Sequence, residues 1–254
     1  GAPEPLLPTD ADAGLLVGSW SPDSRRLLVY RLSGDLLEAG IVSLEDRSVR
    51  WTGLTPDLPV TGQSNGWLDD HRLALTIRPD GDLPWMLRFD GTGMPEMDQR
   101  WRATIAGRTP SRTRVETHGG RVETDAEPSA LQLMELDVDT GTARVLAQGV
   151  IRDMSPAPGG DRIAVLTSAK PAPPHPLDGV IQSAVQTRSR LTIIDVASGE
   201  AETPSETLDI APHLLRWSPA GDALLVWART DEQAWAEARL TSVGAEGAVH
   251  RFDT

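Results

Sequence analysis

The residues that first suggest chemistry are 62–66, which read Gly-Gln-Ser-Asn-Gly and match the G-x-S-x-G pattern of a nucleophile elbow. In an elbow, a strand runs into a sharp turn that exposes the serine, and a helix follows. Here Pro56 and Pro59 disfavour a central strand upstream of the motif. Downstream, apolar and polar residues alternate over 72–77, which is the period of a strand. We therefore predict that Ser64 lies in a polar loop between strands and is not a nucleophile.

Histidines and acidic residues raise a second possibility, a metal site. The five histidines are scattered, at positions 71, 118, 175, 213 and 250, and no two have the i, i+4 spacing of a helical metal pair. His71 follows Asp69 and Asp70, and these three residues fit either a metal cluster or a solvated turn before a strand. The turn agrees better with the surrounding pattern. The chain has no cysteine and no phosphate-binding glycine loop. We therefore predict no catalytic residue, no metal and no cofactor.

Composition and charge limit the classes of partner. The chain has 254 residues, 39% of them hydrophobic, which is enough for one large all-β domain or two small domains. Its formal net charge of −13 disfavours phosphate backbones and anionic membranes, so no nucleic-acid partner is expected. No apolar run approaches the ~20 residues of a membrane span, so no membrane insertion is expected. The opening Gly-Ala-Pro-Glu, without methionine, is expected to be a trimmed or mature terminus.

An internal repeat is the most informative feature of the sequence. Residues 20–30 read WSPDSRRLLVY and residues 217–227 read WSPAGDALLVW, so both combine Trp-Ser-Pro, a small turn and an apolar strand. Residues 154–167 form a third copy, Met-Ser-Pro with a slightly longer turn, and residues 67–76 form a fourth copy that keeps the tryptophan. Spacings of this kind predict repeated strand-turn-strand units.

A second strand follows each copy and ends in an aspartate, a turn and a glycine. Asp137 lies four residues before Gly141, and Asp195 lies four residues before Gly199. Looser versions occupy 41–48 and 87–93. Aspartate accepts bonds from its own backbone and glycine tolerates positive φ, so the pattern predicts tight hairpins. A calcium loop is the alternative interpretation of these aspartates.

The phase of the repeat predicts the fold class. The two Trp-Ser-Pro copies lie 197 residues apart, and four steps of about 49 residues are close to the length of a four-stranded propeller blade. A missing copy falls near 110–147. We predict an all-β β-propeller with about five recognisable four-stranded blades, either complete or part of a larger ring. Residues 1–254 would form this single propeller domain or propeller fragment.

Two insertions interrupt the repeat, near 95–112 and at 171–184. In the first, Met97, Trp101 and Ile105 recur every four residues between Pro95 and Gly107, which predicts one short surface helix inserted between blades. The second is proline-rich and is expected to form an exposed loop.

The stretch 20–30 resembles the strand signature of the Tol-system propellers and of the N-terminal propellers of prolyl oligopeptidase-family serine peptidases. Residues 100–115 look more like the peptidase propellers of Gram-negative bacteria. The peptidase propellers of that family usually have seven or eight blades and precede an α/β-hydrolase domain that holds the catalytic serine. The present chain has fewer recognisable blades and no such domain, and no family catalytic residue matches a position in it.

Tryptophans suggest where contacts form. Trp20, Trp67 and Trp217 share one position of the repeat and are expected to pack between neighbouring blades. Trp101 and Trp235 lie outside that pattern. Together with Pro173 and His175 of the second insertion, they are the candidate residues for contact with a partner or substrate.

The resemblance implies a non-catalytic propeller that gates or positions peptide substrates for a serine hydrolase domain outside this chain. Its partner would be that domain, or a peptide or protein. The alternative is a stand-alone periplasmic protein-interaction propeller of the Tol-like kind. A propeller enzyme such as a lactonase or glycosidase would need acidic or histidine ligands in the central channel, whereas the repeat places its carboxylates in turns. A periplasmic or secreted location is expected, and the absence of cysteine suits the cytoplasm equally.

Overall fold

The computed structural model describes residues 5–7, 13–108, 130–171, 187–244 and 247–252. Four sheets, each an antiparallel meander of four consecutive strands, make up these parts of the chain. Blade 1 comprises β1 (Gly14–Trp20), β2 (Arg26–Ser33), β3 (Leu36–Ser43) and β4 (Ser48–Trp51). Blade 2 comprises β5 (Asn65–Trp67), β6 (Arg72–Ile77), β7 (Leu131–Asp137) and β8 (Ala143–Gly149). Blade 3 comprises β9 (Ile151–Pro156), β10 (Arg162–Pro171), β11 (Thr187–Asp195) and β12 (Ala201–Glu202). Blade 4 comprises β13 (Leu208–Trp217), β14 (Ala223–Thr230), β15 (Arg239–Gly244) and β16 (Val249–Arg251).

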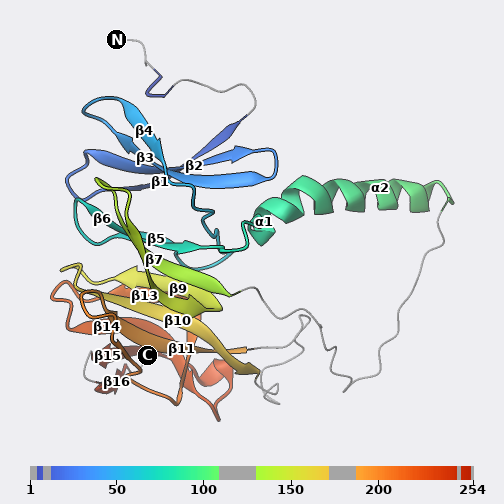
Figure 1. Ribbon diagram of the computed structural model, residues 1–254. Coiled ribbons are helices and arrows are strands. Elements are labelled where there is room, and N and C mark those ends of the chain that lie inside the picture. The colour runs from blue at the N-terminus through green and yellow to red at the C-terminus, as the bar shows by residue number, and fades with distance from the viewer. Residues whose placement is uncertain (1–4, 8–12, 109–129, 172–186, 245–246, 253–254) are drawn as a thin grey trace.

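This arrangement confirms the prediction of an all-β propeller fold. Figure 1 shows the blades following one another in chain order, with blade 1 and blade 4 at opposite ends of the stack. The described residues hold four blades, where about five were expected. The copy sought near 110–147 is not a separate blade, because its described strands, β7 and β8, complete blade 2. The hairpin expected around residues 119–120 lies outside the described residues.

The first insertion lies within a blade. It contains α1 (Trp85–Arg88), the π-helical turn η1 (Phe89–Gly93) and α2 (Met94–Ile105), all between β6 and β7. These two strands pair directly, with Leu73 opposite Leu136, so the prediction of a helix between blades is wrong. The second insertion likewise falls between the paired strands β10 and β11, and residues 172–186 are outside the described part. None of the helices in the described ranges is long and apolar enough to cross a membrane.

The register of the strands corrects the third copy of the repeat. Trp20 lies opposite Leu27 and Trp217 opposite Leu224, seven positions further along the chain in both cases. In blade 3 the residue opposite Ile163 is Pro156. Pro156 therefore takes the place of the tryptophan, and the turn is no longer than in the other copies. The predicted alignment placed Met154 at the tryptophan position because Met-Ser-Pro resembles Trp-Ser-Pro. It was wrong by two residues, since the strand register places Pro156 there.

The hydrophobic core lies at the junctions between neighbouring blades. Blade 1 buries Leu28 and Ile41 against Leu73 and Leu75 of blade 2. Residues of blade 2 pack in turn on blade 3, and residues of blade 3 pack on blade 4. The strands alternate their side chains between two faces, so one strand contributes to two junctions. Blades 2 and 3 thus bury both of their apolar faces against their neighbours.

Tryptophan side chains contribute a hydrogen bond at two of the three junctions. The indole Nε1 of Trp67 donates to the main-chain oxygen of Ser19 in blade 1 at 3.1 Å. The indole Nε1 of Trp217 donates to that of Ser155 in blade 3 at 2.8 Å. Their predicted packing between blades is confirmed. For Trp20 the same prediction is wrong, since its side chain is 50% exposed on β1 and no described blade precedes it.

Replacing these indoles by a phenyl ring separates the hydrogen bond from the packing. Trp67→Phe and Trp217→Phe should each lower the free energy of unfolding by about 0.5–1.5 kcal/mol, because a junction carbonyl loses a donor. In dilute, monomeric protein, Trp20→Phe is the matched control and should lie within about ±0.5 kcal/mol of the parent, as expected for an exposed side chain. Urea unfolding gives the free energy of unfolding of all three variants. It is monitored by circular dichroism of the backbone, because the substitutions change the tryptophan signal itself. Equal losses at the three positions would contradict the junction assignment.

Candidate functional site

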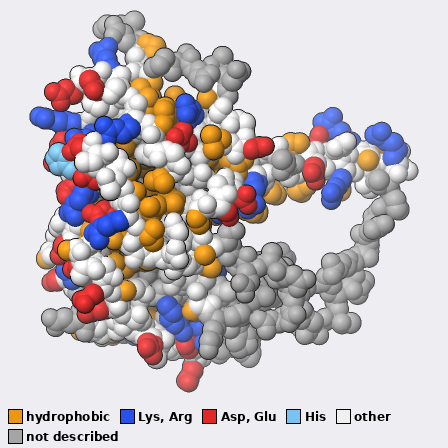
Figure 2. Space-filling view, viewed as in Figure 1, with side chains coloured by type: hydrophobic (Ala, Val, Ile, Leu, Met, Phe, Trp, Pro, Cys, Tyr) orange, Lys and Arg blue, Asp and Glu red, His pale blue; other side chains and the backbone are white. Residues whose placement is uncertain are grey.

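Helix α2 carries a row of large apolar side chains that are exposed to solvent in the described part of the chain. Met94, Met97, Trp101 and Ile105 are 49%, 57%, 67% and 73% exposed, respectively. Their spacing of three, four and four residues places them along one side of the helix. No residue of α2 is buried. Figure 1 shows α2 projecting away from the blades, and Figure 2 shows hydrophobic side chains interspersed with charged ones along it. We refer to Met94–Ile105 as the arm.

The arm is helical for local reasons. Pro95 occupies its first turn, where the missing N–H costs nothing. Two ion pairs of i, i+4 spacing, Glu96 to Arg100 and Asp98 to Arg102, lie on its surface at 3.4 and 2.9 Å. Such pairs each stabilise a helix by about 0.2–0.5 kcal/mol. The apolar side chains of the stripe, at i, i+3 and i, i+4 spacing, can add similar increments, yet all four stay exposed.

The four candidate contact residues do not form one site within the described residues. Trp101 lies on the arm, within blade 2. Trp235 lies in the short 3-10 helix η2 (Trp235–Glu237) of blade 4, where the Arg229 guanidinium stands 4.4 Å from its ring centre. Pro173 and His175 fall outside the described residues. The sequence identified the arm through Trp101, and the contact of these four residues with a partner or substrate stays a prediction.

Ser64 is not part of a nucleophile elbow. It directly precedes the short strand β5, and a turn and strand β6 follow in place of a helix. Ser64 lies in the expected segment between strands, but it is buried there, and its main-chain oxygen accepts a bond from the Thr76 N–H at 2.7 Å. A buried hydroxyl without an adjacent base is a poor nucleophile.

Both glycines of the G-x-S-x-G motif serve the junction with blade 3. Gly62 has φ +85°, and a Cβ there would lie 2.5 Å from the main-chain oxygen of Arg152. A Cβ on Gly66 would lie 2.6 Å from Cγ of Pro156. The motif therefore reflects the close approach of its main chain to the main chain of Arg152 and the ring of Pro156 in blade 3.

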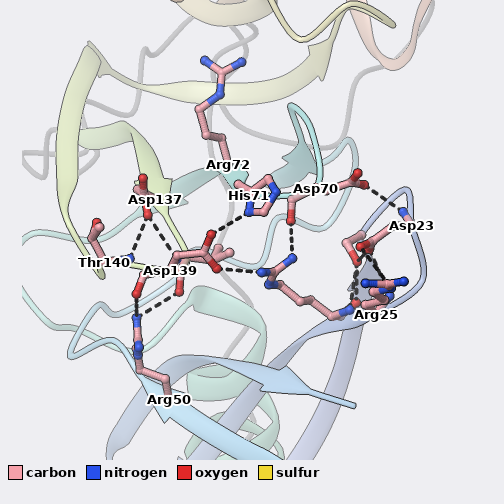
Figure 3. Close-up of polar contacts among 12 residues, drawn as sticks. Asp23, Arg25, Arg50, Asp70, His71, Arg72, Asp137, Asp139 and Thr140 are labelled. Atoms are coloured by element: carbon pink, nitrogen blue, oxygen red, sulfur yellow. Dashed lines mark hydrogen bonds and ion pairs between the residues drawn. The ribbon is translucent and has the colours of Figure 1, made fainter. Parts of the chain in front are cut away.

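His71 belongs to a network of ion pairs and turn contacts, drawn in Figure 3. Its Nδ1 lies 2.5 Å from Oδ2 of Asp139, and Nη2 of Arg26 lies 2.6 Å from Oδ1 of the same carboxylate. Asp69 Oδ1 accepts bonds from the main-chain N–H groups of His71 and Arg72. Arginine and backbone donors thus occupy these carboxylates, and the described ranges contain no group of side chains suited to a metal ion. The turn interpretation is confirmed.

The repeated turn aspartates behave in the same way. Oδ1 of Asp137 accepts bonds from the N–H groups of Asp139 and Thr140, and Oδ1 of Asp195 accepts one from Ser198. The backbone bonds from Thr140 and Ser198 lower the pKa of Asp137 and of Asp195 below the ordinary range. These carboxylates close hairpins and keep their charge near neutral pH, as the turn pattern predicted.

Asp153 is a polar residue that sequence reasoning missed. It lies on β9 with 1% of its surface exposed. Its Oδ1 accepts bonds from the main-chain N–H groups of Gln63 and Met154, at 2.7 and 2.9 Å. Its Oδ2 has no hydrogen-bond partner among the described residues. Burial raises the pKa of Asp153, and the two backbone bonds oppose that rise. The residue fastens the segment before β5 to blade 3.

Comparison with known proteins supplies fold relatives. No protein-family model and no curated protein sequence matches the chain. It is similar to TolB from Acinetobacter baumannii, with a TM-score of 0.45, 9% identity, and coverage of 94% of this chain and 43% of that one. It is also similar to the Pyrococcus horikoshii acylaminoacyl peptidase, with a TM-score of 0.48 and 15% identity. That match covers 94% of this chain and 32% of the peptidase. A third similar structure is the β-propeller domain of the Trilobed protease from Pyrococcus furiosus, with a TM-score of 0.47 and 13% identity. That match covers 91% of this chain and 54% of the other. The chain spans about a third to a half of the lengths of these three proteins.

Asp153 and Asp137 provide a pH test with opposite signs. The pKa of Asp153 is raised in the fold, so the folded state binds this proton more tightly and gains stability from it as the pH falls towards 4. Asp153→Asn lacks that gain, and its stability relative to the parent should fall between pH 7 and pH 4. The pKa of Asp137 is lowered, so Asp137→Asn should instead improve relative to the parent over the same range. Urea unfolding at both pH values measures the two differences; differences that do not move with pH would contradict the assignments.

Proposed function

We propose that this chain is the propeller of a peptidase-like system, and that its blades gate or position peptides for a serine hydrolase domain outside the chain. The exposed arm is the observation that carries the proposal. It projects from paired strands of blade 2 and presents apolar side chains that nothing in the described structure covers. In this proposal the arm docks on the hydrolase domain and holds the blades over its entrance.

The arm has the chemistry of a helix that binds in an apolar groove. Anchors at i, i+3, i+7 and i+11 are the pattern by which such helices are recognised. Trp101 lies inside the stripe, and tryptophan is enriched among the residues that dominate binding energy. The arm has two acidic and two basic residues, so it is neutral within a chain of net charge −13. Apolar burial, and not charge attraction, would therefore drive docking.

The blades themselves favour a non-catalytic role. Ser64 is buried with its backbone engaged in the sheet, His71 pairs with an exposed carboxylate in a turn, and Asp153 binds main-chain N–H groups. Each group thus has a structural task of its own. Catalysis in the proposed system would belong to the separate domain.

A stand-alone interaction propeller is the second candidate. The same arm favours it, because an apolar stripe can bind a protein that has no hydrolase activity. The two candidates differ in the identity of the bound protein, which an active-site probe can read.

The chain alone tests the non-catalytic part of the proposal. Purified protein should not react covalently with a fluorophosphonate probe, and it should not cleave activated esters or short peptides above background, because Ser64 lacks an adjacent base. Stoichiometric labelling that disappears in Ser64→Ala would make this chain the hydrolase and overturn the proposal.

Capture experiments test the docking part. The immobilised chain is incubated with an extract of the source organism that has been treated with a fluorophosphonate probe. It should retain a labelled serine hydrolase. Trp101→Ser combined with Ile105→Ser should weaken binding by ~30-fold or more, the effect of losing a residue worth about 2 kcal/mol. Val60→Ser, at a loop position as exposed as Trp101, is the matched control and should bind normally.

The outcomes separate the two candidates. Arm-dependent capture of unlabelled proteins alone would favour the interaction propeller, and capture that ignores the arm would overturn both. If a hydrolase is retained, adding the chain should slow its cleavage of long or folded substrates more than its cleavage of short peptides. Equal effects on both substrate lengths would remove the gating role.

A further inference from the structure

The blade junctions follow a rule that is visible at two of them. At each, the indole Nε1 of a tryptophan at the end of one inner strand donates to a main-chain oxygen of the preceding blade. The pairs are Trp67 with Ser19 and Trp217 with Ser155. Ser19 and Ser155 hold equivalent positions, since each directly precedes the aromatic position of its own blade, occupied by Trp20 and by Pro156. The rule therefore names a donor on one side of a junction and an acceptor on the other.

An arginine reinforces the same two junctions. Arg26 donates through Nη1 to the main-chain oxygen of Asp70, and Arg162 donates through Nη2 to that of Gly221, at 2.9 and 2.7 Å. Both arginines begin the second strand of their blade, and both acceptors lie in the first turn of the next blade. The junction is thus a repeated set of contacts and not a chance pair.

Blade 1 presents one half of this junction, and no described blade lies opposite it. Trp20 holds the donor position, is 50% exposed, and its indole makes no hydrogen bond within the described residues. Leu15, Leu16 and Val17 on the same strand are exposed as well. On the same face, Leu6 and Leu7 help to cover Leu27, the residue opposite Trp20, together with Val29 and Val42, so β1 is the part of this face left exposed.

Blade 4 presents the other half. Arg216 directly precedes Trp217 and therefore holds the acceptor position of Ser19 and Ser155. A main-chain oxygen has two lone pairs, so it can serve the sheet and an incoming indole together, as the Ser155 oxygen does. Leu225 and Trp227 are half-buried on the face of β14 opposite to Leu224 and Val226, which pack towards blade 3. No described blade covers this face of blade 4.

We propose that blade 4 of a second copy packs on β1, with the Trp20 indole of one copy donating to the Arg216 carbonyl of the other. The complementary halves lie on one chain and at opposite ends of the blade stack (Figure 1), so the contact is head-to-tail. A head-to-tail contact closes into a ring or grows into a filament. Two copies of the four described blades would give a ring of eight, within the usual range for closed propellers. This proposal does not depend on the role of the arm.

Charge predicts how the association responds to salt. Each copy carries a net charge of −13, so the two repel one another over distances comparable to the Debye length. The contact itself is made of apolar side chains and an indole hydrogen bond. Dimer formation should therefore increase with ionic strength, the opposite of an association held by ion pairs.

Cysteine cross-linking gives a specific test because the chain contains no cysteine. Two single variants are prepared, Val17→Cys on the open side of blade 1 and Arg216→Cys on blade 4. Both positions are exposed, so the changes should not disturb folding. With a short bismaleimide linker, an equimolar mixture should give a covalent dimer, whereas each variant alone should give at least ~5-fold less, because a head-to-tail contact places unlike positions together. Equal cross-linking of all three samples, or none, would overturn the proposal.

Light scattering at increasing protein concentration tests the role of Trp20. The parent chain should show a dimer that strengthens with salt, and Trp20→Ala should raise its dissociation constant ~10-fold or more. Trp101→Ala, an exposed tryptophan on the arm, is the control and should leave the dimer intact. A strictly monomeric parent chain, or a dimer lost only in Trp101→Ala, would overturn the proposal. A monomeric parent chain would mean that a second copy does not cover β1. A dimer lost only in Trp101→Ala would mean that the copies associate through the arm.

Discussion

The close contact between neighbouring blades is the constraint on which the rest of the structure depends. A single blade cannot fold alone, because its strands alternate apolar side chains between two faces and both need cover. On β6, Leu73 and Leu75 pack towards blade 1, whereas Ala74 packs towards blade 3. The backbones approach so closely that glycine is required: a Cβ on Gly160 would lie 2.0 Å from the main-chain oxygen of Leu68. Packing and glycine placement thus serve the same junctions.

The sequence predicted the blades where their signals are local, and it failed where the contacts are distant. A Trp-Ser-Pro turn and the apolar strand after it lie within a few residues, so blades 1 and 4 could be recognised directly. Blade 2 was not recognised as one sheet, because Leu73 pairs with Leu136 across the whole helical insertion. The blade count and the placement of the helix were wrong for this one reason. In blade 3, Pro156 fills the tryptophan position, and only the strand register reveals it.

The candidate sites show the same division. Turn aspartates such as Asp137 bind their own backbone, so local sequence predicted their role correctly. The glycines on either side of Ser64 are required by the close approach of Arg152 and Pro156 in another blade. The five-residue motif contains no sign of these distant neighbours. Asp153 was missed for the same reason, since its N–H partner on Gln63 lies in a different blade. The helix of the arm could be predicted because the spacing of its apolar residues is a local feature of the sequence. Only the fold shows that no described residues cover its apolar side.

The position of the arm inside a blade bears on how it can act. The strands on either side of the insertion pair directly, with Ile77 of β6 opposite Gln132 of β7, so the arm belongs to the sheet of blade 2. The arm itself has 12 residues and no buried side chain, and an isolated helix of that length is marginally stable in water. A rigid base with a marginal, apolar tip is suited to a contact that completes its order on binding. The ordering cost is then confined to one helix while the junctions that hold the blades stay intact.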